Sequence, residues 1–508
     1  MLKKSVVLAS VVALSLLGAA CGGSSSTDGG STPSSAPSTG ATASPAASEG
    51  PKAPLRMLMQ YGRFDPNKDF TAGLIKDKTG YDVTYDMLPA ENYDEKLNLM
   101  VANKEEFDVM KLSATQFFKL ATSGALEPLD DLVNKYGPNV NQAIKPQSWT
   151  STTIDGKKYA IPETGSGISV GEELIIRQDW LDELGLKMPT TLDEFYTVLK
   201  TIKEKKNIIP LTGSKDSLYG DIAAAFGVPY GSTSDWVLKD GKLLHKAELP
   251  EMKEFLTYMN KLNAEGLLDP EMAINTAAKA IEKFTGGKAA VYKLAWWNAP
   301  NTMTALTKNF PEAKVSVVPF LKGKDGKVSL SVSNGTSWYI AIPKYSKHKE
   351  DAMKLLNAKL EKETFKSLAI GIEGTHHEVK DGKFFPILPK FNDDLTNGSV
   401  FMTGVDETNY PIYWQARVRK DPVLQKFYED FQKNAEGLLV EDPMSFAPPI
   451  DAISKNKQKL TKLLDDNVIK FISGSEPVAN YDKFLTQWKA EGGDETIKAA
   501  NEWYKTKK

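Results

Sequence analysis

The sequence predicts an α/β protein in which a parallel sheet is covered by crossover helices. Two observations lead to this class: strand-like and helix-like segments alternate from residue 55 onward, and 41% of the 508 residues are hydrophobic while 25% are charged. That composition is ordinary for a globular protein, and the length exceeds what a single domain usually holds. We therefore expect two domains, each with a core of normal size.

The first run of elements ends near residue 123. Ser113 and Gly80 are typical helix-cap residues, at the start of one helix and the end of another. Strands are expected at 55–59, 81–87 and 107–112, and helices at 69–78, 92–103 and 113–123. This β-α-β-α order implies parallel strands, and ligands bind beyond the carboxyl ends of such strands.

A second run begins after residue 162. Thr191 and Glu194 have the spacing of a capping box, which would open a helix with its apolar residues facing inward. Further strands are expected at 173–177, 289–293, 315–320 and 338–343. From Glu350 onward the pattern is mostly helical.

The first 54 residues have the pattern of an export signal followed by a tether. A positive start and an apolar stretch too short for a bilayer lead to Cys21, the only cysteine. Its position resembles the lipidated cysteine of a bacterial lipobox, although Gly18 stands where Leu is usual. We expect 1–21 to be a lipoprotein signal peptide and 22–54 a disordered linker of Ser, Gly, Pro, Ala and Thr. The alternative is a plain secretory signal with an incidental cysteine.

Composition argues against several function classes. Lys+Arg total 63 and Asp+Glu total 65, so a nucleic-acid partner held by bulk charge is not expected. One cysteine and four histidines leave little material for a metal site, and neither a metal nor a cofactor is expected. Asp65 begins a stretch like a calcium loop, but Phe70 and Lys76 replace the required Gly and Glu, so a helix N-cap fits better. P-loop, GxSxG and HExxH motifs are absent, so no enzyme is expected.

An ordered set of segments resembles the extracellular sugar-binding proteins of ABC importers, the family that includes maltose-binding protein. Each segment is weak alone, but the order is specific and covers nearly all of 55–508. The late segments are similar to the longer oligosaccharide-binding lipoproteins of Gram-positive bacteria. The matching segments are 126–130, 155–162, 177–186, 189–195, 284–291 (FTGGKAAV), 318–320, 340–343, 371–374 and 492–504.

The resemblance implies a periplasmic-binding-protein fold of two α/β lobes, with a hinge, an interlobe cleft and an extended helical C-terminal part. Lobe 1 is expected to comprise 55–161 and 286–333, and lobe 2 to comprise 162–285 and 334–508. It also implies a monomer that binds an oligosaccharide or other carbohydrate by closure about a hinge near residues 159–167 and 333–343. The partners would be two ABC permease subunits with a cytoplasmic ATPase, and the membrane would be reached only through the lipid anchor, on the outer face of the cell.

Candidate ligand-binding residues follow from sugar chemistry, because sugars offer apolar C–H faces to aromatic rings and polar edges to hydrogen-bonding groups. Trp296 and Trp297 follow a strand in an expected loop, and the alternative is that one packs in the core. Trp338 lies beside the second hinge segment and fits either cleft or hinge packing. Gln60 and Tyr61 follow the first strand, where a simple turn is the alternative.

The other candidates lie near the hinge and in the C-terminal part. Glu163 follows the first hinge segment, where glycines could serve the hinge instead, and Glu373 belongs to the late matching segment. Residues 410–414, with Tyr410, Tyr413 and Trp414, form an expected aromatic and cationic loop together with Arg417, and core packing is the alternative.

Two other functions stay open at this stage. One is a surface-anchored glycan hydrolase or lyase, because 65 acidic residues make some carboxylate pair inevitable. The other is a ligand-binding partner of a sensor kinase.

Overall fold

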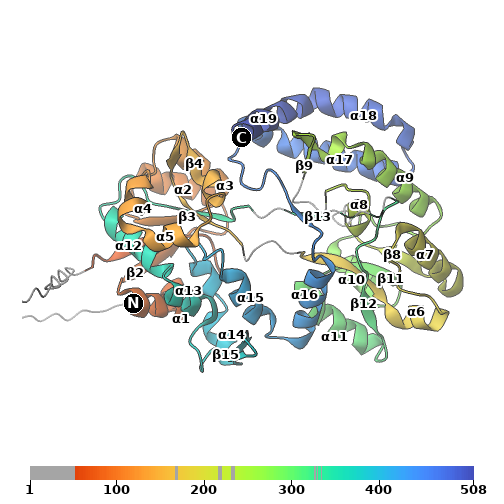
Figure 1. The fold of residues 1–508 in the computed structure, drawn as a ribbon, viewed down its shortest axis with the longest axis horizontal. Helices are drawn as coiled ribbons and strands as arrows, with labels where there is room; N and C mark the ends of the chain where they lie inside the picture. The colour runs from red at the N-terminus through yellow and green to blue at the C-terminus, as the bar shows by residue number, and fades with distance from the viewer. Residues whose placement is uncertain are drawn as a thin grey trace, which may run out of the picture. The chain divides into compact units, whose positions relative to one another are not determined.

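The computed structural model describes residues 52–165, 170–214, 220–229, 235–324, 326, 328, 330–332 and 335–507. The predicted signal peptide, Cys21 and nearly all of the predicted linker therefore lie outside the described residues. Two separate sheets organise the described chain, and each forms the centre of one half of residues 51–508 (Figure 1).

The first half is built on a five-stranded mixed sheet. Its strand order is β2 (Val83–Met87), β1 (Leu55–Met59), β3 (Val109–Leu112), β14 (Trp338–Ala341) and β6 (Ile161–Glu163). The first three strands are parallel, as predicted, while β14 runs antiparallel to both β3 and β6. Strand β3 is buried along its whole length, so its single charged residue, Lys111, lies inside the protein.

The helices between these strands begin and end close to the predicted residues. They are α1 (Phe70–Thr79), α2 (Tyr93–Ala102) and α3 (Ala114–Thr122). Ser113 and Gln116 form a full capping box at α3, and Gly80 ends α1 in the left-handed conformation. The predicted N-cap role for the Asp65 region is confirmed: Asp65 accepts from the backbone N–H of Asn67, and Asp69 caps α1.

The second half is built on a four-stranded sheet. Its order is β12 (Val315–Val317), β7 (Glu172–Arg177), β11 (Ala289–Ala295) and β8 (Ile209–Thr212). Helix α7 (Leu192–Lys206) covers it with a buried apolar stripe of the predicted residues. Thr191 caps α7, but the carboxylate of Glu194 accepts from Thr190 N–H at 2.8 Å, so the predicted capping box forms only in part.

The strand pairing corrects the expected lobe boundaries. Strands β11 and β12 both pair with β7, and β11 also pairs with β8, so these strands of the range 286–333 belong to the second half and not to lobe 1. Conversely, β14 and α12 (Lys349–Lys359), α13 (Lys362–Ile370) and α15 (Tyr410–Val418) pack into the core of the first half. The expectation failed because pairing between distant strands leaves no mark in the local pattern.

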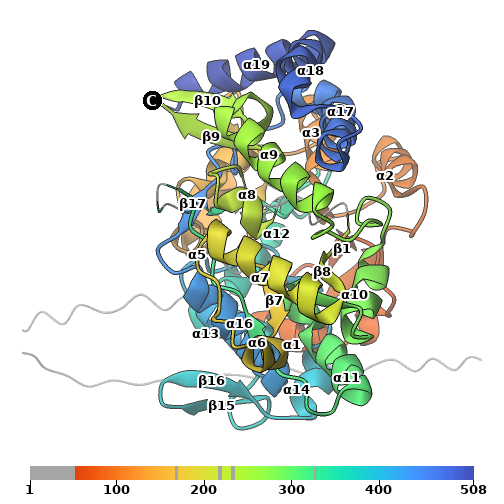
Figure 2. The same cartoon turned by 90° about the vertical axis from the view of Figure 1, so that its right-hand side faces the viewer.

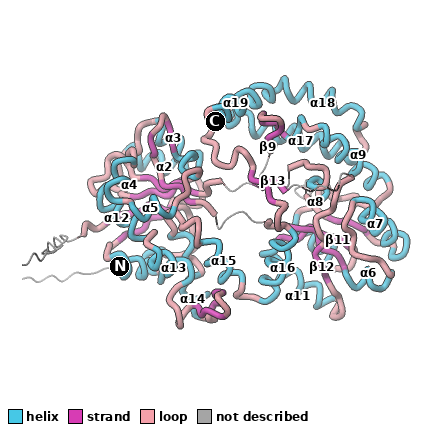
Figure 3. The backbone as a smooth tube through the Cα atoms, in the orientation of Figure 1, coloured by secondary structure: helices cyan, strands magenta, loops and turns pink. Residues whose placement is uncertain are grey.

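The C-terminal segment is helical, as predicted, and most of it joins the second half (Figure 3). Helix α16 (Pro422–Asn434) packs with β11, and α17 (Asp451–Ser473) packs along α9 (Pro250–Ala264). Helices α18 (Tyr481–Trp488) and α19 (Asp494–Lys505) complete this cover beside the β9–β10 hairpin, residues 236–245 (Figure 2). Within the described residues, no helix is both long and apolar enough to cross a bilayer.

Candidate functional site

A pocket of about 420 Å³ opens at the edge of the first sheet where several strands end. The carboxyl ends of β1, β3 and β6 meet there with the start of β14, the 399–405 segment and α15. This is the edge at which α/β sheets place their ligands. The pocket, hereafter the first-half pocket, is lined by Gln60, Tyr61, Lys111, Glu163, Thr164, Gly165, Ser337, Trp338, Ser399, Val400, Met402, Val405, Tyr410 and Trp414.

A buried ion pair joins three of the pocket's segments. Lys111 Nζ donates to Glu163 Oε1 and Oε2 at 2.8 and 2.9 Å. The same ammonium group donates to the main-chain oxygens of Met402 and Val400 at 2.9 and 3.2 Å. Lys111 and Glu163 are 3% and 6% exposed, so solvent screens their attraction little. The pair therefore ties β3 and β6 to the 399–405 segment.

Burial dominates the electrostatics of this pair. It lowers the pKa of Lys111 and raises the pKa of Glu163, while the attraction between the two groups opposes both shifts. Lys359 lies one layer behind and donates to Phe401 O at 2.7 Å. Burial, with repulsion from Lys111, lowers the pKa of Lys359 to about 7.

Four aromatic rings, those of Tyr61, Trp338, Tyr410 and Trp414, line the pocket at different depths. Trp338 is half-buried, pairs across the sheet with Glu163, and has its ring centroid 5.8 Å from Lys111 Nζ. Trp414 is also half-buried and meets Tyr410 edge-on, with ring centroids 6.0 Å apart. Tyr61 is 50% exposed at the mouth. Rings held by the core on one side with a face left open are suited to stacking on a flat apolar ligand surface.

Neutral polar groups stand between these rings. The Gln60 side-chain amide donates to Lys111 O at 2.7 Å and to Gln116 Oε1 at 2.9 Å, which holds it at the pocket edge. Thr164 Oγ1 donates to Glu407 Oε1 at 3.2 Å. Ser337 is held by its main-chain N–H, which donates to Glu163 O at 2.8 Å. These fixed groups can exchange hydrogen bonds with a ligand that bears hydroxyls.

Tyr413 and Arg417 do not line this pocket, contrary to the predicted loop. The segment is helix α15, on which residues four apart share a face. Tyr410 and Trp414 lie on the face toward the pocket, and Tyr413 and Arg417 lie on another face. Tyr413 is buried against Phe384, with ring centroids 5.4 Å apart. Arg417 Nη1 donates to Leu395 O at 3.1 Å, and burial lowers the pKa of its guanidinium.

Three further candidates lie elsewhere. Trp296 and Trp297 form a short 3₁₀ helix after β11, in the second half. Trp297 is 51% exposed and covers Gly171, where an added Cβ would meet its ring at 3.0 Å; Trp296 is half-buried against Tyr428, with centroids 5.1 Å apart. Glu373 is exposed and pairs with Lys366 at 3.3 Å, outside the first-half pocket.

Lys111 is a pocket residue that the sequence analysis missed. Lys111 had a readable signal, because a lysine between the apolar residues Met110 and Leu112 of an expected buried strand needs a buried partner. Tyr410 belongs to the predicted aromatic segment 410–414, and the packing of α15 against the first sheet brings it to the pocket.

The family described as bacterial extracellular solute-binding protein matches residues 67–363 of this chain. An uncharacterized protein of Niallia circulans, from the butB 5′ region, is 63% identical over 255 residues, which are 50% of this chain and 100% of that protein. Lipoprotein LipO of Bacillus subtilis is 29% identical over 454 residues, 85% of this chain and 88% of that protein. The B. subtilis polygalacturonan/rhamnogalacturonan-binding protein YtcQ is 27% identical over 469 residues, 87% of this chain and 89% of that protein.

Among solved structures, the chain is similar to the Streptococcus pneumoniae ABC-transporter substrate-binding protein FusA in complex with kestose. The TM-score is 0.63 at 21% identity, and the match covers 89% of this chain and 99% of that chain. At this identity the likeness concerns the fold, and it confirms the predicted two-lobed α/β architecture.

Proposed function

Because this chain belongs to the family of bacterial extracellular solute-binding proteins, we propose that it captures an oligosaccharide and delivers it to an ABC importer. The family is one of solute-binding proteins, which supports capture of the ligand without chemical change. The relatives named for the sugars they bind, YtcQ and FusA, support a carbohydrate ligand here.

The observation that supports this proposal best is the make-up of the first-half pocket. Half-buried Trp338 and Trp414 and exposed Tyr61 line it together with the neutral polar groups of Gln60 and Thr164. Rings for C–H faces beside hydrogen-bonding groups for hydroxyls are what a sugar requires. Trp297, exposed in the second half, is the candidate for the opposite face of the same ligand.

Titration calorimetry with an oligosaccharide panel tests the proposal. The panel holds kestose, N,N′-diacetylchitobiose, trigalacturonate and its methyl ester. We expect at least one member to bind, and Trp338→Ala and Trp414→Ala each to weaken binding at least tenfold, since a central aromatic anchor is commonly worth about 2 kcal/mol. Trp503→Ala is the matched control, because Trp503 is also half-buried but lies on α19. Release of smaller sugars during incubation would favour the hydrolase or lyase alternative.

Delivery would use closure about the segments that connect the two halves. The chain passes between the two sheets after β6 and again before β14, near the predicted hinge segments 159–167 and 333–343. Small-angle scattering should give a smaller radius of gyration with bound sugar than without it. An unchanged scattering profile at saturating ligand would argue against closure.

The predicted lipid anchor on Cys21 completes the proposal, with LipO as a relative named as a lipoprotein. Cys21→Ser should move the protein from the membrane fraction to the medium while sugar binding persists. Membrane retention of this variant would contradict the anchor.

A further inference from the structure

We propose that the first-half pocket selects uncharged oligosaccharides and rejects those whose sugars carry carboxylates. This inference rests on the proposed function and names the substrate class within it. Sequence relatives leave the matter open, because YtcQ is named for polygalacturonan, an acidic polymer, while FusA is named for a neutral fructooligosaccharide.

The charges that line the pocket neutralise each other. Among its described lining residues, Lys111 and Glu163 are the ionisable groups of opposite charge, and they bind one another at 2.8 and 2.9 Å. Lys111 also donates to Met402 O and Val400 O, so its three protons are all engaged within the protein. A sugar carboxylate would therefore meet no lysine proton that is still available.

Charged side chains that lie behind the pocket lining are also equal in number for each sign. Lys359 donates to Phe401 O, and Arg417 donates to Leu395 O. The two acidic side chains are Asp406 and Glu407. Asp406 accepts from the N–H groups of Thr408 and Asn409 at 3.1 and 3.0 Å. Glu407 accepts from Ser148 Oγ at 3.0 Å. These four side chains are two basic and two acidic groups, so together they add no excess positive charge that would attract an anionic sugar.

Trp297, the exposed tryptophan of the second half, also has a neighbouring ion pair. Lys293, on the strand that leads to Trp297, pairs with Glu172 Oε2 at 2.8 Å. Glu172 adjoins Gly171, which Trp297 covers. Lys293 and Glu172, which lie beside the segment that carries Trp297, thus also neutralise each other.

A carboxylate entering such a pocket loses hydration without gaining a counter-charge, and that loss is far more costly than the loss suffered by a hydroxyl. A neutral sugar has no such penalty, and its hydroxyls match Gln60, Thr164 and Ser337. The same lining that suits a neutral sugar therefore disfavours a uronate.

The test compares the binding of acidic oligosaccharides with that of neutral ones. Calorimetry on the full chain at pH 7 measures trigalacturonate against its fully methyl-esterified form, and kestose and N,N′-diacetylchitobiose against a sialylated and a glucuronate-bearing trisaccharide. We expect every ligand with measurable binding at millimolar concentration to be neutral, or to bind at least tenfold more tightly in its neutral form.

Substitutions that change the charge of the Lys111–Glu163 pair test whether this pair causes the preference for neutral sugars. In Glu163→Gln the Lys111 cation loses its counter-charge, so acidic sugars should gain at least tenfold in affinity relative to neutral ones. In the double variant Lys111→Met, Glu163→Gln no charge remains, and the preference for neutral sugars should persist. Asp269→Asn is the matched control: it removes the carboxylate of another buried lysine pair, with Lys283, outside this pocket, and should leave the preference unchanged.

The outcomes separate the inference from the function on which it rests. Equal or tighter binding of the acidic forms by the unmodified protein would overturn the inference and leave the proposed function standing. An unchanged preference in a folded Glu163→Gln variant would overturn the role of the pair. If neither neutral nor acidic sugars bind, the proposed function itself falls, and the inference falls with it.

Discussion

Two buried lysine–carboxylate pairs, one in each half of the protein, have the same nitrogen–oxygen distance, but the pKa values of their members are shifted in opposite directions. Lys111–Glu163 and Lys283–Asp269 both bring nitrogen and oxygen to 2.8 Å. Burial lowers the pKa of Lys111 and raises that of Glu163. In the second pair burial acts in the same direction, but hydrogen bonds overcome it, so the pKa of Asp269 is lowered and that of Lys283 is raised.

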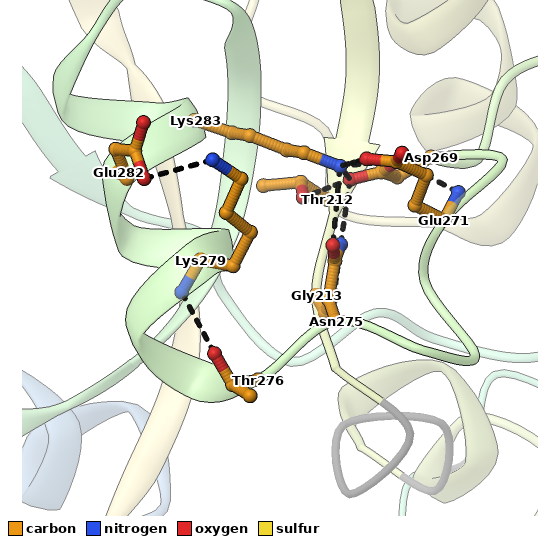
Figure 4. A network of polar contacts seen from close by, with 9 residues as sticks. All are labelled: Thr212, Gly213, Asp269, Glu271, Asn275, Thr276, Lys279, Glu282 and Lys283. Atoms are coloured by element: carbon orange, nitrogen blue, oxygen red, sulfur yellow. Dashed lines mark hydrogen bonds and ion pairs between the residues drawn. The ribbon is translucent and has the colours of Figure 1, made fainter.

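The difference lies in the number of partners around each pair. Asp269 also accepts from Thr212 Oγ1 at 2.6 Å, from Asn275 Nδ2 at 2.9 Å and from Glu271 N–H at 3.0 Å, and Lys283 also reaches the exposed carboxylate of Glu271 (Figure 4). Within the described residues, the carboxylate of Glu163 accepts one hydrogen bond besides those from Lys111, a long one from Gly404 N–H at 3.5 Å. Extra hydrogen-bond donors stabilise a buried carboxylate as an anion. A buried carboxylate without them depends on its lysine partner alone.

The largest expected effect comes from removing each lysine. Lys111→Met leaves Glu163 buried without a cation and should lower the free energy of unfolding by about 3–5 kcal/mol. Lys283→Met leaves Asp269 with its three other donors, so we expect a loss of about 1–3 kcal/mol. Urea unfolding followed by tryptophan fluorescence measures both, and equal losses would remove the distinction between the pairs.

Lys359, beside the first pair, should make stability depend on pH. Its folded pKa of about 7 lies below the unfolded value of 10.5, so the unfolded chain binds more protons between these values and stability rises with pH there. The penalty for burying the charge is complete below pH 7. Relative to Lys359→Met, the native protein should gain about 3 kcal/mol between pH 7 and 9.5. Parallel stability curves for the two proteins would contradict this.

Removing both members of the first pair should cost less than removing one. In Lys111→Met, Glu163→Met no buried charge is left unpaired, so the loss should shrink to about 1–2 kcal/mol despite two substitutions. A double-mutant cycle in urea gives the coupling energy directly. Additive losses would show that the two side chains stabilise the fold independently.

The smallest change in stability is expected at Glu271, which is an additional, exposed partner of Lys283. Its side chain is 57% exposed, so solvent screens its attraction to Lys283. Glu271→Gln should change the free energy of unfolding by about 0.5 kcal/mol or less. A loss as large as that of Lys283→Met would mean that the exposed carboxylate, and not Asp269, stabilises the lysine.

Local chemistry made much of the fold predictable. The strands of the first sheet and the helices between them follow from apolar periodicity and from caps such as Ser113 and Gly80, which act within a few residues. The aromatic and polar residues at strand ends could be named for the same reason: Gln60 and Trp338 adjoin strands whose ends form the edge of the sheet.

What the sequence determined by itself was therefore the element order, the caps and the residue types suited to a sugar. Which residues meet was decided only by the tertiary structure, because contacts between distant segments leave no local periodicity. Lys111 finds Glu163 52 residues away and Met402 291 residues away, and β11 joins β7 across the second sheet. The helical turn of α15 likewise directs Trp414 to the pocket and Tyr413 to the core, although the two are neighbours in sequence.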